Sequence, residues 1–125
     1  RIELNHKQEI FIEGDVVTLN EVRNIVKAFV DNNGASDCDY CTGKQLAESS
    51  DHPREAVVSL SHDALTKYEL FISVQDEITK AYYDLRARYI ENEFNKTPNQ
   101  ITDNEFKIVK EVYPFIVSEV MVKKD

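Results

Sequence analysis

The stretch Ala56-Val57-Val58-Ser59-Leu60 decides the fold, together with the segment that follows it. It is apolar along most of its length, which is typical of a strand at the centre of a sheet. Residues 64 to 97 then contain neither glycine nor proline, and apolar side chains recur there every three or four positions, as on one face of a long helix. Asp84 and Arg88 are spaced to form an i,i+4 ion pair on the exposed side of this helix. Its apolar positions are Tyr68, Phe71, Val74, Ile78, Tyr82, Leu85 and Tyr89.

Two short strands and a helix are predicted on the N-terminal side of that strand. Residues 2–5 and 9–13 have the composition of strands, and Gly14-Asp15 turns the chain. Thr18 and Glu21 match a capping box, in which each side chain satisfies a backbone N–H of the other residue. Apolar residues at helical spacing then predict a helix, and the Asn-Asn-Gly sequence at 32–34 favours a left-handed helix end.

The C-terminal side is predicted to add a loop, a short helix and a last strand. Residues 34–55 are polar and predict a loop with one helical turn near Lys44 to Glu48. Thr102 and Glu105 match a second capping box, which opens a short helix that ends before Pro114. Residues 115–120 close the chain as a strand.

Together these elements predict one domain of the α+β class. We expect a small mixed sheet of about four to five strands, with two main helices on one face and an extra short C-terminal helix. No linker-like composition divides residues 1–125, so we expect a single domain.

The charge balance excludes nucleic acids and anionic lipid surfaces as partners, and the glycine content excludes a phosphate-binding loop. The chain has 23 acidic and 15 basic residues, which gives a formal net charge of −8. A protein that binds nucleic acids or anionic lipid surfaces needs concentrated positive charge, and this sequence has no basic stripe. The chain has only 3 glycines and no glycine-rich phosphate loop. We expect no cofactor, no catalytic constellation and no metal site.

The only two cysteines, Cys38 and Cys41, lie in the polar loop and allow several interpretations. A thiol catalyst would place them at a helix N-terminus, but here they follow a helix and flank Asp39, whose charge disfavours a thiolate. Zinc would need four ligands, of which the two cysteines and His52 supply three. We favour a disulfide staple over a very short loop in an oxidising compartment. Two reduced thiols in a tolerant loop remain the alternative.

Two segments carry polar residues at marked positions on an apolar background. In residues 9–17 a strand, a glycine turn and a returning chain precede a capped helix. In residues 56–82 a central strand leads to Asp, and after a turn Tyr-Glu begins a helix with Val and Asp further along. The marked positions are Gly14, Asp63, Tyr68, Glu69, Val74 and Asp76. This pattern resembles the periplasmic domain of ExbD/TolR proteins over residues 9–31, residues 56–82 and the final strand.

The cysteine loop and the prolonged second helix depart from the short family members, so the chain looks like a long variant. The resemblance implies a non-enzymatic, homodimeric subunit that pairs with an ExbB-like membrane subunit, uses the proton-motive force and passes energy to a TonB-like protein for outer-membrane nutrient import. It also implies the periplasmic domain of a single-pass inner-membrane protein. In the family a transmembrane helix with a proton-carrying Asp precedes this domain. We expect that helix ahead of Arg1, as the only attachment to the membrane.

Two alternative functions stay open. A TolR-like subunit would act as a peptidoglycan-binding anchor of the Tol system. A periplasmic thiol oxidoreductase would use Cys38 and Cys41 as its redox pair.

Candidate interface residues follow from the predicted edges and from the length of the second helix. A helix over 68–95 would be about 40 Å long, so we expect its distal part to meet the short C-terminal helix or another subunit. The strands of residues 2–12 and 115–120 are candidate sheet edges, and an edge binds partners by adding a strand unless its charges protect it. The candidate partner or dimer residues are Ile10, Ile12, Tyr82, Tyr89, Phe94, Phe115 and Val117.

Overall fold

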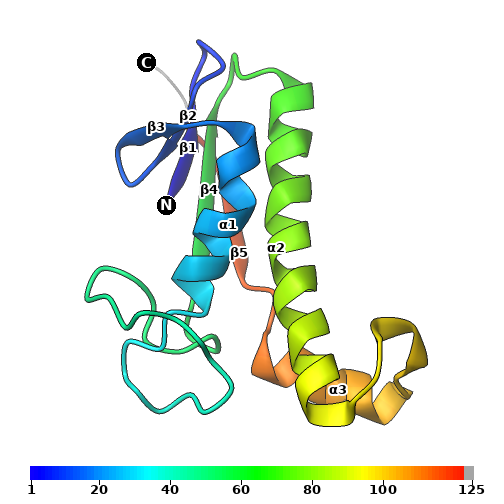
Figure 1. Ribbon diagram of the computed structural model, residues 1–125. Coiled ribbons are helices and arrows are strands. Elements are labelled where there is room, and N and C mark those ends of the chain that lie inside the picture. The colour runs from blue at the N-terminus through cyan, green and yellow to red at the C-terminus, as the bar shows by residue number, and fades with distance from the viewer. Residues whose placement is uncertain (123–125) are drawn as a thin grey trace.

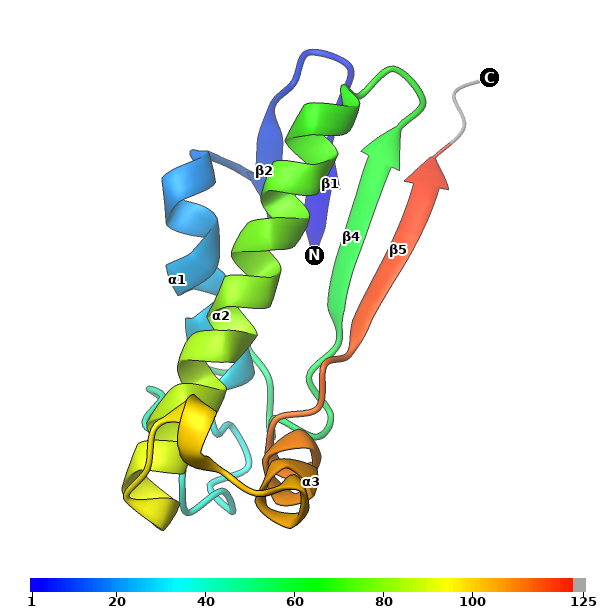
Figure 2. The ribbon, with the colours of Figure 1, turned by 90° about the vertical axis from the view of Figure 1, so that its right-hand side faces the viewer.

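A computed structural model describes residues 1–122, which form a five-stranded mixed sheet with its helices on one face (Figure 1). Turned by 90°, the molecule shows α1 and α2 on the same side of the sheet and α3 beyond the end of the strands (Figure 2). The predicted α+β class is confirmed. The elements are β1 (Ile2–Leu4), β2 (Ile10–Ile12), β3 (Asp15–Val17), α1 (Leu19–Val30), β4 (Val58–Asp63), α2 (Tyr68–Phe94), the 3-10 helix η1 (Pro98–Gln100), α3 (Asp103–Val112) and β5 (Val117–Val122).

The sheet has the strand order β3-β2-β1-β4-β5. β4 pairs in parallel with both β1 and β5, which confirms its predicted central place. β1 and β2 also have a neighbour on each side. The prediction of a sheet edge within residues 2–12 is therefore wrong, and Ile10 and Ile12 lie on an interior strand.

The unpredicted strand β3 explains this difference. β2 and β3 are joined by the two-residue turn Glu13-Gly14, with φ values of 50° and 85°. Both values are positive, as the tight hairpin turns that match strand twist require. The chain after Gly14 therefore folds back and pairs with β2, with Ile12 opposite Asp15.

Both capping boxes are present at the predicted helix starts. The Glu21 carboxylate accepts the Thr18 backbone N–H at 3.0 Å at the start of α1. At α3 the Glu105 carboxylate accepts the Thr102 N–H at 2.8 Å, and the Thr102 hydroxyl accepts the Glu105 N–H at 3.2 Å. These bonds satisfy N–H groups that have no partner within the helix.

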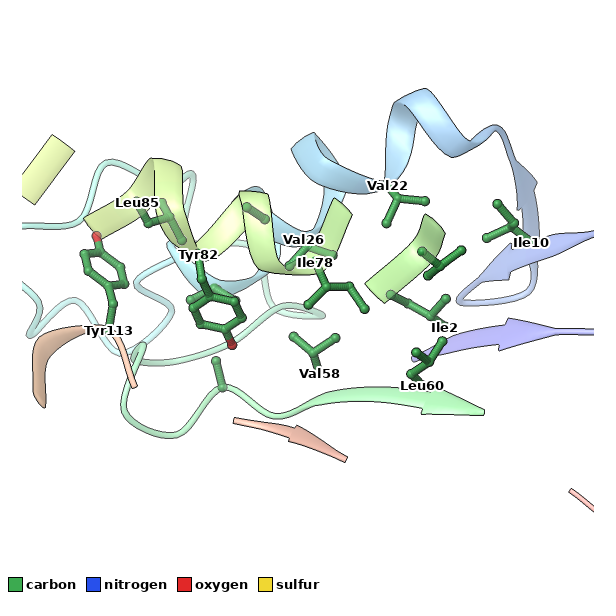
Figure 3. Close-up of a cluster of buried hydrophobic side chains, with 14 of the residues drawn as sticks. Ile2, Ile10, Val22, Val26, Val58, Leu60, Ile78, Tyr82, Leu85 and Tyr113 are labelled. Carbon is green, nitrogen blue, oxygen red and sulfur yellow. The ribbon is translucent and has the colours of Figure 1, made fainter. Parts of the chain in front are cut away.

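The core lies between the sheet and the two long helices. Figure 3 shows valines of α1 and the α2 side chains of Ile78 and Tyr82 pointing toward β1 and β4. Removing this apolar surface from water is the main force that holds the helices on the sheet. Its most buried members include Ile2, Leu60, Val22, Val30, Val74, Ile78, Tyr82, Leu85 and Tyr113.

Near Lys44 to Glu48, where one helical turn is predicted, the loop of residues 34–55 forms no helix but a single hydrogen-bonded turn, in which the Ser49 N–H donates to the Leu46 carbonyl at 3.3 Å. Its backbone instead bonds to the end of α1: the Gly43 N–H donates to the Asp31 carbonyl at 3.0 Å, and the Gln45 N–H donates to the Asn32 carbonyl at 2.9 Å. A Cβ at Gly43 would lie 2.2 Å from the Asp31 carbonyl oxygen, so only glycine fits this close approach.

Candidate functional site

The backbone of β5 forms an open edge of the sheet. The Val58 N–H donates to the Ile116 carbonyl at 3.0 Å, and Val58 is paired with Val117. In a parallel ladder only alternate residues of a strand bond to a given neighbour. The backbone groups of residues 116, 118, 120 and 122 that bond to a neighbour therefore point toward β4. The N–H and C=O groups of Val117, Glu119 and Met121 point away from it.

The side chains of β5 are unusually apolar for an exposed strand. Val120, Met121 and Val122 are each about half exposed, at 51%, 48% and 52%. The Glu119 carboxylate accepts a hydrogen bond from Gln75 of α2 at 2.6 Å, so it faces the helices. Alternation then places Val120 and Val122 on the sheet face that the helices leave uncovered.

The opposite edge of the sheet is much shorter. β3 has three residues, against six in β5. A very short edge strand offers few backbone groups to a partner and is a common way to block unwanted pairing. β5 is therefore the edge better suited to strand addition.

Of the predicted interface residues on α2, the structure buries Tyr82, whereas Tyr89 and Phe94 are half-buried. The Tyr82 side chain is 1% exposed, and its ring centroid lies 5.0 Å from that of Phe115. Tyr89 packs edge-on against Tyr40 at 5.4 Å and against Phe94 at 6.0 Å. The cysteine loop thus covers the distal part of α2 at Tyr89, and Tyr82 is not available to a partner.

Of the remaining predicted interface residues, Phe115 and Val117 stay on the open edge. Phe115 is 50% exposed just ahead of β5, and Val117 is half-buried at its start. Ile10 is buried in the core and Ile12 packs against it, on a strand that has β1 and β3 as its two neighbours in the sheet. Glu119 and Met121 also belong to this edge, and no sequence signal marks them, because their role depends on the direction of their backbone groups and not on residue type.

Cys38 and Cys41 are joined in a disulfide. Cys38 is buried, and the Asn33 side-chain amide bonds to both its N–H and its carbonyl, at 3.0 and 3.1 Å. The bridge holds Tyr40 inward, where its hydroxyl donates to the Val112 carbonyl at 2.7 Å. Burial raises the pKa of Tyr40 to about 12. The disulfide loop is therefore attached to the end of α3.

Asp31 is the centre of a buried polar network at the end of α1. Its carboxylate accepts two bonds of 3.0 Å from one guanidinium nitrogen of Arg88 and one of 2.6 Å from the Tyr113 hydroxyl. The Thr42 N–H and hydroxyl also donate to it, at 3.1 and 2.9 Å. Burial and the hydrogen bond to Asp31 raise the pKa of Tyr113 far above its usual value. Because donors surround both of its oxygens, the Asp31 carboxylate has a structural role: it joins the end of α1 to α2, to the cysteine loop and to the residue after α3.

The predicted ion pair between Asp84 and Arg88 is wrong, because Arg88 turns inward to Asp31. Asp84 instead lies 3.3 Å from the Lys27 ammonium group and 3.8 Å from Arg23. These pairs hold α1 against α2. The helical spacing in the sequence could not show this partner, because Asp31 follows α1 and lies 57 residues from Arg88.

The positions that resemble the ExbD/TolR motif have mainly structural roles here. Gly14 forms the β2–β3 turn, and the Asp63 carboxylate accepts the Leu65 N–H at 2.8 Å in the turn before α2. Val74 is buried, whereas Glu69 and Asp76 are exposed. Tyr68, which the periodicity placed on the buried face, is 73% exposed because it begins α2 beyond the core.

Within residues 1–122 no cluster of three or more His, Cys, Asp or Glu side chains is arranged to hold a metal ion. In the same part of the chain, no helix combines the length and apolar character needed to span a bilayer. Comparisons of the chain with protein-family models, with curated proteins and with solved structures found no match.

Proposed function

We propose that this chain is a protein-binding domain that captures an extended partner segment along the edge of β5. The observation that carries the proposal is the outward direction of the backbone groups of Val117, Glu119 and Met121 on a six-residue edge. Strand addition uses such backbone groups for affinity and neighbouring side-chain positions for specificity. The half-exposed Val120, Met121 and Val122 provide apolar contacts for the added strand.

The biological role that we propose is that of a periplasmic domain of an ExbD/TolR-like subunit in an inner-membrane complex. It would work with an ExbB-like membrane subunit and pass energy from the proton-motive force to a TonB-like protein. The support is the residue pattern around Gly14, Asp63 and Tyr68-Glu69, together with an exposed edge suited to an extended segment. In this role the domain transmits force through protein contacts and performs no covalent chemistry.

A homodimer is part of the same proposal, because two β5 edges could pair with each other. Pairing between copies and capture of a partner segment would compete for the same backbone groups. Sedimentation of the chain alone and with the partner segment distinguishes the two uses of the edge. A dimer that dissociates when the segment is added indicates a shared edge.

The binding test uses a matched pair of variants at Glu119. Glu119→Pro removes one outward N–H, and proline is tolerated at such positions of an edge strand. Glu119→Ala keeps the N–H and removes the carboxylate that contacts Gln75. We expect affinity for the periplasmic segment of the TonB-like partner to fall by about fivefold or more in the proline variant only. Equal affinities of the two variants would argue against strand addition at β5.

Two further experiments separate the proposed role from its alternatives. Sedimentation with purified sacculi tests peptidoglycan binding, and retention on them without binding to a TonB-like partner would favour the TolR-like anchor. The coding region ahead of Arg1 should contain an apolar segment of about 20 residues with an Asp. A cleavable signal peptide alone in that region would contradict the membrane-subunit role.

A further inference from the structure

A groove between α2 and α3 has the size and lining of a small-molecule site. Its cavity volume is about 460 Å³, within the range of about 300 to 1,000 Å³ typical of ligand pockets. The lining is mainly apolar and comes from both helices, from the η1 segment and from Phe115, two residues ahead of β5. The lining includes Tyr83, Arg86, Ala87, Asp103, Phe106 and Phe115.

Arg86 brings a positive charge into this groove without a carboxylate partner. Its Nε–H donates to the Tyr113 carbonyl at 3.0 Å, and within residues 1–122 it takes part in no ion pair. Arg88, two residues along the same helix, is by contrast bonded to Asp31. Burial lowers the pKa of Arg86, as expected for a charge that is partly removed from water.

The terminal nitrogens of Arg86 are therefore suited to an anion. A guanidinium binds a carboxylate through two parallel N–H···O bonds, and such charge-assisted bonds are stronger in a partly dry site. Tyr83, Phe106 and Phe115 are large exposed apolar residues of the groove wall and would cover an apolar body. Asp103 also lines the groove and would repel a second negative charge on the ligand.

We propose that the α2–α3 groove binds a small molecule with one carboxylate and an apolar body, with the carboxylate on Arg86 and the body against Tyr83, Phe106 and Phe115. A fatty acid of medium length has this chemistry and suits the volume of the groove. This inference goes beyond the proposed protein-binding role and does not depend on it: Phe115 borders both surfaces, but the outward backbone groups of β5 belong to Val117, Glu119 and Met121, which do not line the groove.

The test uses decanoate below its micellar concentration as the probe, with decanol and decanedioate as matched ligands. Binding is followed by amide shifts in a titration of isotopically labelled protein at neutral pH. We expect saturable shifts confined to the groove with decanoate. We expect binding to be about tenfold weaker, or more, for decanol, which lacks the charge, and for decanedioate, which brings a second charge near Asp103.

Two variants and one control assign the effect to the groove. Arg86→Gln should weaken decanoate binding to the affinity measured for decanol. Since Arg86 also holds the Tyr113 carbonyl, Ala87→Phe serves as a second variant that fills the groove and leaves the guanidinium in place. Arg54→Gln is the control, because Arg54 is exposed and donates to a carbonyl, that of Glu111, in the same way.

Each of three results would overturn the proposal. The first is the absence of saturable decanoate shifts in the wild-type protein. The second is equal affinity for decanoate and decanol. The third is decanoate binding that Ala87→Phe leaves unchanged in a folded variant, as shown by its amide spectrum.

Discussion

The hydroxyl of Tyr113 donates a hydrogen bond of 2.6 Å to the carboxylate of Asp31, across 82 residues of sequence. Tyr113 follows α3 and Asp31 follows α1, so this bond joins the C-terminal ends of two helices that are far apart in the sequence. Arg88 of α2 and Thr42 of the cysteine loop bind the same carboxylate. The end of α1, helix α2, the cysteine loop and the residue after α3 therefore meet at one buried side chain.

Asp31→Asn should destabilise the domain by about 2–4 kcal/mol, because removing one partner of a buried ion pair leaves the other charge uncompensated. The Asp31 side chain is 6% exposed and that of Arg88 is 32% exposed, so water compensates Arg88 in part. Urea unfolding measures the change. Asp37→Asn, in the exposed part of the cysteine loop, is the control and should change stability by less than about 0.5 kcal/mol. Similar losses of unfolding free energy in both variants would contradict this structural role of the Asp31 carboxylate.

Replacing both Cys38 and Cys41 by alanine should cost about 2 kcal/mol of unfolding free energy, the value expected for cross-linking a very short loop. Urea unfolding of the oxidised wild-type protein and the variant gives the difference. In addition, a thiol titration of native protein isolated without reductant should find no reactive thiol, and the protein should not reduce insulin. Two titratable thiols would show that the disulfide is not the native state.

Tyr82→Phe should be neutral or stabilising, by up to about 1 kcal/mol, because a buried hydroxyl without a partner costs free energy. The Tyr82 hydroxyl is buried and has no hydrogen-bond partner among residues 1–122. Thermal unfolding measures the change. A loss above about 1 kcal/mol would mean that this hydroxyl does have a partner.

The domain should lose stability as the pH rises above about 10, where the tyrosines of the unfolded chain ionise. The folded pKa of Tyr40 is raised to about 12 by burial, and that of Tyr113 is raised further. Between about pH 10 and pH 12 the unfolded chain thus binds fewer protons, and the unfolding free energy falls with pH. Urea midpoints across this range should fall less steeply for Tyr113→Phe than for the wild-type protein. The exposed Tyr68→Phe is the control and should keep the wild-type slope.

Local patterns in the sequence were sufficient for most of the fold. The capping residues and periodicity located α1, α2 and α3, and the apolar run at 56–60 located the central strand. β3 was missed because its only marks are a two-residue turn and two valines. The helical turn predicted at 44–48 is reduced to one hydrogen-bonded turn at 46–49, because the backbone ahead of it bonds to the end of α1, and no local pattern contains that information.

The sequence predicted the candidate site only in part. The last strand was identified as an edge from its position, and Phe115 and Val117 lie on it. The sequence could not show which backbone groups of β5 point outward, because the register against β4 determines this. The inward turn of Arg88 to Asp31 was also hidden, since the partner comes from another helix.

The most direct test of the account is amide hydrogen exchange along β5, with and without the periplasmic segment of the TonB-like partner. The N–H groups of Val117, Glu119 and Met121 point away from β4, whereas those of Ser118 and Val120 already face it and act as internal controls. Strand addition predicts that exchange slows at the first three residues and changes little at the other two. Equal exchange at all five residues, under conditions where the partner is bound, would contradict capture at this edge.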